Sequence, residues 1–212
     1  MSAPPPATVP APYADAGQRD LANHLGMWIL IATEILFFGG LFLAYFIYRN
    51  AYPAAFAAGS HRLDFWSGTI NTGVLLTSSL FMALGDGMIK EGRRRSLQVC
   101  LLLTASLGLV FLAIKFSEYH EMYRERLVPG IRFESDGPPQ LQLFLLLYFT
   151  MTALHALHML IGLGLLVWLM RLNGRGRLGQ EHRAPVSMVG LYWHFVDCVW
   201  VFLYPLLYLI PN

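Results

Sequence analysis

Five ionisable side chains lie well inside long apolar stretches of this 212-residue sequence, and they are the residues best suited to chemistry, whereas Asp86 and Lys115 lie near the ends of such stretches. The five are Glu34 in one stretch, His155 and His158 in a second, and His194 and Asp197 in a third. The three-residue spacing of the last two pairs places both members on one face of a helix. If these stretches span a membrane, each ionisable group costs about 2.5–3.5 kcal/mol on insertion scales and requires an explanation.

Three kinds of chemistry fit these residue types. Converging imidazoles bind haem or a redox metal, but no HxxxH pair, Glu-x-x-His pair or cysteine ligand accompanies them. A proton route requires protonatable groups through the whole bilayer, and these groups thin out in its outer half. Buried polar groups that bond to one another instead hold helices together, at about 0.6–2 kcal/mol each. We therefore predict five buried polar, proton-related side chains, with no catalytic residue and no metal site.

The composition indicates that lipid surrounds the chain. Hydrophobic residues make up 56% of the sequence and charged residues 13%, and the mean hydropathy is +0.49. Soluble domains have roughly 45–50% apolar and about 25% charged residues. The net charge is only +2 and the basic residues form no continuous face, which argues against nucleic acid as a partner.

Five stretches are long enough to cross a hydrocarbon core, which requires roughly 20 apolar residues per helix. They are Met27–Tyr48, Phe65–Met88, Leu97–Phe116, Leu141–Met170 and Met188–Ile210. We therefore predict an all-α, polytopic membrane protein, a bundle of five transmembrane helices over residues 23–212. Residues 1–22 are rich in Pro and Ala and are predicted to be a disordered cytoplasmic tail.

The distribution of Lys and Arg predicts the orientation. The tail and the loops after the second and fourth stretches carry nine of them, whereas the opposite side carries five. The positive-inside rule then places the N-terminus in the cytoplasm and the C-terminus outside a bacterial cytoplasmic (inner) membrane. Trp28 and Tyr208, near the ends of their stretches, suit an interfacial belt. Trp193, Trp200 and Glu118 are expected, with Trp28, to have structural or lipid-interface roles.

Several motifs resemble those of one known family. Ile31–Phe38 (IATEILFF) is similar to the glutamate-bearing helix of subunit III of haem–copper terminal oxidases of the cytochrome c oxidase type. Leu154–Gly162 (LHALHMLIG) is similar to its histidine helix, and Tyr192–Tyr204 (YWHFVDCVWVFLY) to its C-terminal signature. The resemblance covers residues 25–210 in the family's order. The two helices that precede the glutamate helix in the long form have no counterpart, so the chain resembles the short, five-helix form.

The resemblance implies a non-catalytic subunit that contains no cofactor. Haem and copper would belong to the catalytic subunit I, against which this chain would pack together with other oxidase subunits. It would stabilise that subunit, support proton uptake during oxygen reduction, and bind membrane lipids, including structural phospholipid. One alternative is the accessory membrane subunit of a nitric oxide reductase, which shares this short architecture.

Another alternative, from a different class, is a small secondary carrier with a midplane site lined by Glu34, His158 and Asp197. Carriers of this kind usually have internal repeats and helices that are interrupted at mid-membrane. The sequence has no repeat between its halves, and the first four stretches contain no proline. On the subunit interpretation, we instead predict a hydrogen bond of about 2.6–3.2 Å between Glu34 and His158, across the contact between the first and fourth helices.

Overall fold

A computed structural model of the chain describes residues 16–130, 133, 137–179 and 183–210. Its regular elements over these ranges are six helices. They are α1 (Ala16–Ala51), α2 (Pro53–Ser60), α3 (Phe65–Lys90), α4 (Arg94–Arg124), α5 (Leu141–Gly174) and α6 (Ala184–Tyr208). All except α2 contain a window long and apolar enough to cross a membrane. The predicted all-α, five-span membrane bundle is therefore confirmed.

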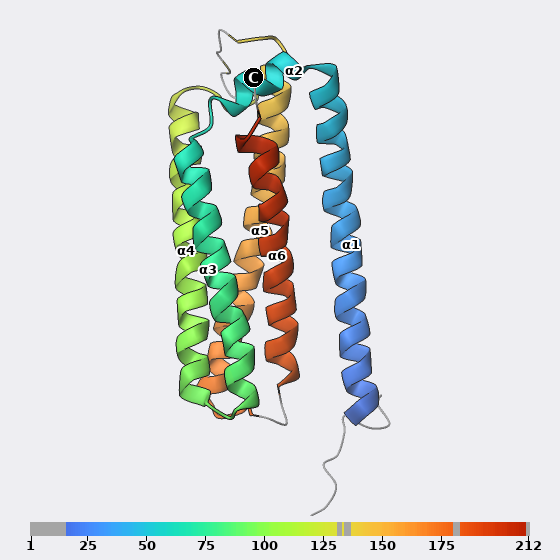
Figure 1. Ribbon diagram of the computed structural model, residues 1–212, viewed down its shortest axis with the longest axis vertical. Coiled ribbons are helices and arrows are strands. Elements are labelled where there is room, and N and C mark those ends of the chain that lie inside the picture. The colour runs from blue at the N-terminus through green and yellow to red at the C-terminus, as the bar shows by residue number, and fades with distance from the viewer. Residues whose placement is uncertain (1–15, 131–132, 134–136, 180–182, 211–212) are drawn as a thin grey trace, which may run out of the picture.

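Four of the long helices form a bundle and the fifth stands beside it. Helices α3, α4, α5 and α6 pack in a ring, in which the contacts are α3–α4, α4–α5, α5–α6 and α6–α3. Figure 1 shows α1 running along this bundle, with the short α2 lying across the end where α1 finishes. Helix α1 contacts α6 and α5, and α2 packs on α5. Side chains on α1 can therefore meet those of two bundle helices.

The helix bounds differ from those predicted. The first helix begins at Ala16, so residues 16–22, which we assigned to the disordered tail, are helical; residues 1–15 of that tail lie outside the described residues. The third predicted span, 97–116, is extended to residues 94–124, and the last, 188–210, becomes 184–208. Hydropathy marks only the part of a helix that hydrocarbon surrounds, whereas backbone hydrogen bonding continues into polar flanks. Helix α2 was not predicted, although Pro53 suits a first helical turn.

The centre of the bundle is built around Trp193, which is fully buried and packs against two glycines. A Cβ atom on Gly108 of α4 would lie 2.8 Å from Trp193 Cη2, and one on Gly162 of α5 would lie 3.0 Å from Trp193 Cε3. At both glycines, close helix packing leaves no room for a side chain. By contrast, a Cβ on Gly164 would meet no atom within 4 Å.

We expect Gly108→Ala to lower the free energy of unfolding by about 1–3 kcal/mol, because the added methyl overpacks a rigid indole. Gly164→Ala is the matched control, since the same change in open space should be neutral or stabilising by up to about 1 kcal/mol. Thermal unfolding of both variants in one detergent provides the comparison. Equal stabilities for the two would show that the Trp193 contact is not tight.

Asp64 caps the N-terminus of α3 outside the membrane-spanning segment. Its carboxylate accepts hydrogen bonds from the backbone N–H groups of Trp66 (3.1 Å) and Ser67 (3.2 Å) and from the Ser67 hydroxyl. The Ser67 hydroxyl bond, with smaller help from the two backbone bonds, lowers the pKa of Asp64 below its ordinary value.

Because this pKa is depressed in the folded chain, the stabilisation is present above the ordinary aspartate pKa and is lost as pH falls through the depressed value. We expect Asp64→Ala to cost about 1 kcal/mol at neutral pH, whereas Asp64→Asn, also a good N-cap, should cost less. Unfolding measured against pH checks both the size and the acid-side loss. If Asp64→Ala lowers the free energy of unfolding by the same amount at the most acidic pH, this prediction is wrong.

Candidate functional site

Glu34 and His158 meet across the contact between α1 and α5. His158 Nε2 lies 3.1 Å from Glu34 Oε2, within the predicted range, so the predicted contact is confirmed. His158 Nδ1 lies 2.7 Å from the Leu154 carbonyl oxygen, which can only accept a hydrogen bond. Nδ1 must therefore carry a hydrogen, and Nε2 either donates to a carboxylate or accepts from a carboxylic acid. In both cases one proton is shared and the pair has no net charge.

The burial of this pair follows from its neighbours. The side chains of Glu34 and His158 are 23% and 12% exposed. The ring of Phe38, one turn after Glu34, packs edge-on against the His158 imidazole, with 5.3 Å between the ring centres. A polar pair without net charge costs much less to bury than a single charge. The contact therefore attaches α1, the helix that stands apart from the bundle, to α5.

His155 points elsewhere, although the sequence placed it on the same helical face as His158. It is fully buried, between the rings of Phe111 at 5.4 Å and Trp200 at 5.2 Å. Neither ring nitrogen has a hydrogen-bond partner among the described residues. A three-residue step turns about 60° short of a full turn, so that His158 can meet Glu34 of α1 while His155 lies against rings of α4 and α6. The two histidines thus face different neighbours.

His194 and Asp197 lie where α6 packs on α3. His194 Nδ1 is 2.6 Å from the Ser79 hydroxyl. Asp197 is 4% exposed, and neither of its oxygens has a hydrogen-bond partner among the described residues, although the Ser79 hydroxyl is nearby. Over those residues, no group of three or more His, Cys, Asp or Glu side chains is placed to share a metal ion.

The most extensive buried polar cluster was not predicted. Lys115 Nζ of α4 lies 2.9 Å from Glu118 Oε2, 3.0 Å from the Tyr148 hydroxyl and 2.7 Å from the Tyr208 hydroxyl. Both tyrosines also donate to Glu118 Oε1, at 2.8 and 2.6 Å. The ammonium additionally lies 5.3 Å from the centre of the Trp200 ring. This cluster joins α4, α5 and α6, and every donor of the ammonium has an acceptor.

The residues expected to have structural or lipid-interface roles divide into exposed and buried ones. Trp28 is 59% exposed, which suits a lipid-facing position. Trp193 and Trp200 are fully buried and Glu118 is 7% exposed, so these three lie inside the bundle, which suits the structural role of the two that we expected. Tyr208, placed in the interfacial belt, is also buried, at 6%. An aromatic side chain at the end of an apolar stretch can face either the bundle interior or the lipid. Its place in the sequence therefore does not predict which of the two it faces.

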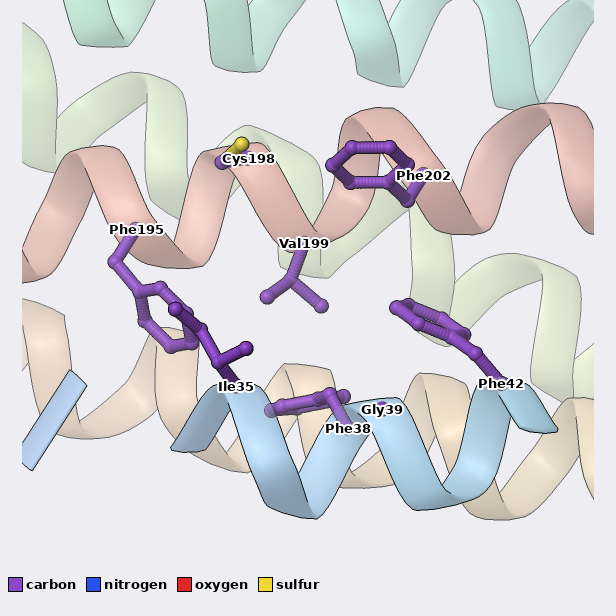
Figure 2. Close-up of a pocket in the computed structure, with 8 residues that line it drawn as sticks. All are labelled: Ile35, Phe38, Gly39, Phe42, Phe195, Cys198, Val199 and Phe202. Carbon is purple, nitrogen blue, oxygen red and sulfur yellow. The ribbon is translucent and has the colours of Figure 1, made fainter. Parts of the chain in front are cut away.

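An apolar groove of about 350 Å³ lies between α1 and α6. Figure 2 shows its two walls facing one another, with phenylalanine rings on both sides. Its lining residues are Ile35, Phe38, Gly39 and Phe42 from α1, and Phe195, Cys198, Val199 and Phe202 from α6. Every one of these side chains ends in carbon or sulfur, or is a glycine, so the groove suits hydrocarbon and offers no hydrogen-bonding group to a polar substrate.

Fold and site together define a class: a polytopic helical membrane protein with several pairs and one cluster of bonded polar groups inside its bundle. The sequence matches the family model described as cytochrome c oxidase subunit III over residues 14–211. The chain belongs to the cytochrome c oxidase subunit III family, which confirms the resemblance seen in its motifs.

The names of similar proteins agree with this family assignment. The cytochrome c oxidase subunit 3 of Thermostichus vulcanus is 32% identical over 89% of this chain and 87% of its own length. That of Synechocystis is 31% identical over 92% of this chain and 78% of its own. A protein of Aeropyrum pernix named heme-copper oxidase subunit I+III is 29% identical over 87% of this chain, which corresponds to 22% of that longer protein.

Proposed function

We propose that this chain is the non-catalytic subunit III of an aerobic respiratory haem–copper oxidase, and that it stabilises the catalytic subunit and supports proton uptake during oxygen reduction. The observation that carries the proposal is the Glu34–His158 pair at 3.1 Å, a proton-sharing contact built on the family's motifs. It lies within the membrane-spanning parts of α1 and α5. We place the chain in a bacterial cytoplasmic membrane, with its N-terminus in the cytoplasm.

The haem and copper belong, in this proposal, to the partner catalytic subunit. The relative from Aeropyrum pernix, named as subunit I+III in one protein, supports subunit I as that partner. Within this chain, the buried histidines favour a structural role. His155 is enclosed by two aromatic rings, and His158 is already bonded to Glu34 and the Leu154 carbonyl.

The groove between α1 and α6 is the place in this chain that favours structural phospholipid. Its walls are apolar, it lies within two membrane-spanning helices, and it is bounded by parallel helices that run along the direction of acyl chains. Burial of acyl-chain methylenes against such walls contributes about 0.8 kcal/mol per CH₂ group. A bound acyl chain would fill the space between α1 and the bundle and so hold α1 in place.

An optical and metal analysis of the gently solubilised native complex tests this proposal. Haem a or haem o bands together with copper, in a complex that contains this chain, are the expected result. Haem b together with non-haem iron would instead assign the chain to a nitric oxide reductase. Purification of the chain alone, with transport activity in vesicles, would identify a carrier. The uninterrupted backbone of α1, α3, α4 and α5 through the membrane argues against that last outcome.

A further inference from the structure

A series of hydrogen bonds joins α3 to α6 along most of their shared length. The pairs are Thr69–Tyr204 (2.7 Å), Thr72–Trp200 (3.1 Å), Ser78–Trp193 (3.1 Å), Ser79–His194 (2.6 Å) and Asp86–Ser187 (2.6 Å). From the first pair to the last, 17 residues toward the C-terminus of α3 are matched by 17 residues toward the N-terminus of α6. The pairs thus define one antiparallel register, with a small or polar residue on α3 opposite a polar or indole group on α6.

Asp197 interrupts this register. Its position falls opposite Leu75 and Leu76, between the Ser79–His194 and Thr72–Trp200 pairs, and the hydroxyl of α3 that lies near it, that of Ser79, is already bonded to His194. Both carboxyl oxygens lack hydrogen bonds, and no charged group among the described residues interacts with it. A carboxyl group with no partner at this depth is costly to bury, and intramembrane ionisable residues usually mark a contact or a pathway.

The contact between α3 and α6 reaches the outer surface of the bundle in the middle of the membrane. His194 is only partly buried and lies ten residues into the 25-residue α6, about 15 Å along it at helical rise. Ser79 is also partly buried, and the flanking Leu76 and Val201 are 54% and 42% exposed. Hydrocarbon gives no hydrogen bond to an imidazole, so a lipid-facing position for His194 is unfavourable.

The composition of this surface indicates the chemistry of its partner. Asp197 beneath it is acidic, whereas Asp86, near one end of the α3–α6 contact, is already paired with Lys90 at 2.5 Å. Among the described residues, the mid-membrane level carries no basic group besides the His194 imidazole. By contrast, the exposed surface of α4 at comparable depth is apolar, with Leu109 at 59% and Val110 at 44% exposure. The exposed surface of α4 is therefore compatible with lipid. The surface where α3 meets α6 is better matched by a protein that supplies hydrogen-bond donors.

We propose that the α3–α6 seam, defined by Leu76, Ser79, His194 and Val201 with Asp197 beneath, is the surface that binds the catalytic subunit. The partner there is a membrane-spanning helix of that subunit, with a hydroxyl, amide or cationic side chain at mid-membrane level. This inference rests on the proposed function and adds to it the face through which the two subunits meet.

The test is purification of the complex through a tag on the catalytic subunit, with the ratio of this chain to that subunit as the readout. Leu76→Trp places bulk on the seam, and Leu109→Trp is its control, because both leucines are more than half exposed. His194→Phe removes hydrogen bonding, and His194→Gln restores it. The amount of each variant in the membrane, measured through a tag on this chain, verifies that it is inserted and retained.

We expect Leu76→Trp and His194→Phe to lower the ratio by at least about tenfold, as loss of a central interface residue does. Leu109→Trp and His194→Gln should keep it within about twofold. A full ratio for Leu76→Trp, or an equal loss for Leu109→Trp, overturns the assignment of this face. Failure of the unaltered chain to co-purify with a haem–copper subunit overturns the proposed function itself, and the two failures are therefore distinguishable.

Discussion

Lys115→Met is expected to lower the free energy of unfolding by about 3–5 kcal/mol, the largest effect of any single change considered for this chain. The side chains of Lys115 and Glu118 are 4% and 6% exposed. Removing the ammonium leaves the Glu118 carboxylate buried against two tyrosine hydroxyls with no cation, and the cost of that uncompensated charge exceeds the worth of the lost contact. Denaturant or thermal unfolding of the chain in mild detergent measures it.

Two further variants distinguish the loss of the buried cation from a nonspecific destabilisation of the fold. Lys90→Met removes a lysine that is 51% exposed and 2.5 Å from Asp86, and it should cost less than about 1 kcal/mol, as surface pairs do. The double variant Lys115→Met/Glu118→Leu removes both charges and should be more stable than Lys115→Met alone. If the double variant is the less stable of the two, the cluster does not act as a buried ion pair.

Glu34→Ala should cost about 1–3 kcal/mol, because it leaves a largely buried imidazole without its hydrogen-bond partner. Glu34→Gln should cost less. With His158 Nδ1 donating to the Leu154 carbonyl, Nε2 can accept from the glutamine amide and the contact between α1 and α5 persists. Unfolding of the complex and the decline of oxygen reduction over many turnovers are the measurements.

The neighbouring Thr33→Ala is the control for this pair of variants. Thr33 is exposed and its hydroxyl donates only to the Leu30 carbonyl of its own helix, so its loss should change stability little. On the supporting-subunit account, both Glu34 variants reduce oxygen normally in the first turnover. Loss of that first turnover in Glu34→Gln would make Glu34 a catalytic residue and would refute the account.

The sequence was sufficient to predict the features that follow from the hydrocarbon core of the membrane. The five spans followed from apolar length, and the Glu34–His158 contact followed from the resemblance to a family together with the need of buried polar groups for one another. Helix ends were less well predicted because flanking residues such as Glu118 continue a helix that hydropathy no longer marks.

The Lys115 cluster could not be predicted because its members are far apart in sequence. Tyr148 and Tyr208 are 33 and 93 residues from Lys115, and nothing in their local sequence distinguishes them from lipid-facing aromatics. The signal that was present is the spacing of Lys115 and Glu118, which puts a cation and an anion on one helical face. Likewise, the different directions of His155 and His158 depend on where α1 lies relative to the bundle, which spacing along α5 does not specify.

The central claim is that this chain supports a catalytic subunit without taking part in its chemistry, and removal of the chain tests it most directly. Oxygen reduction is followed from the first turnover in matched complexes purified with and without this chain. The account predicts a near-normal initial rate without it, with slower proton uptake and earlier loss of activity over repeated turnovers. A complex that lacks the chain and reduces no oxygen even in the first turnover would contradict the account.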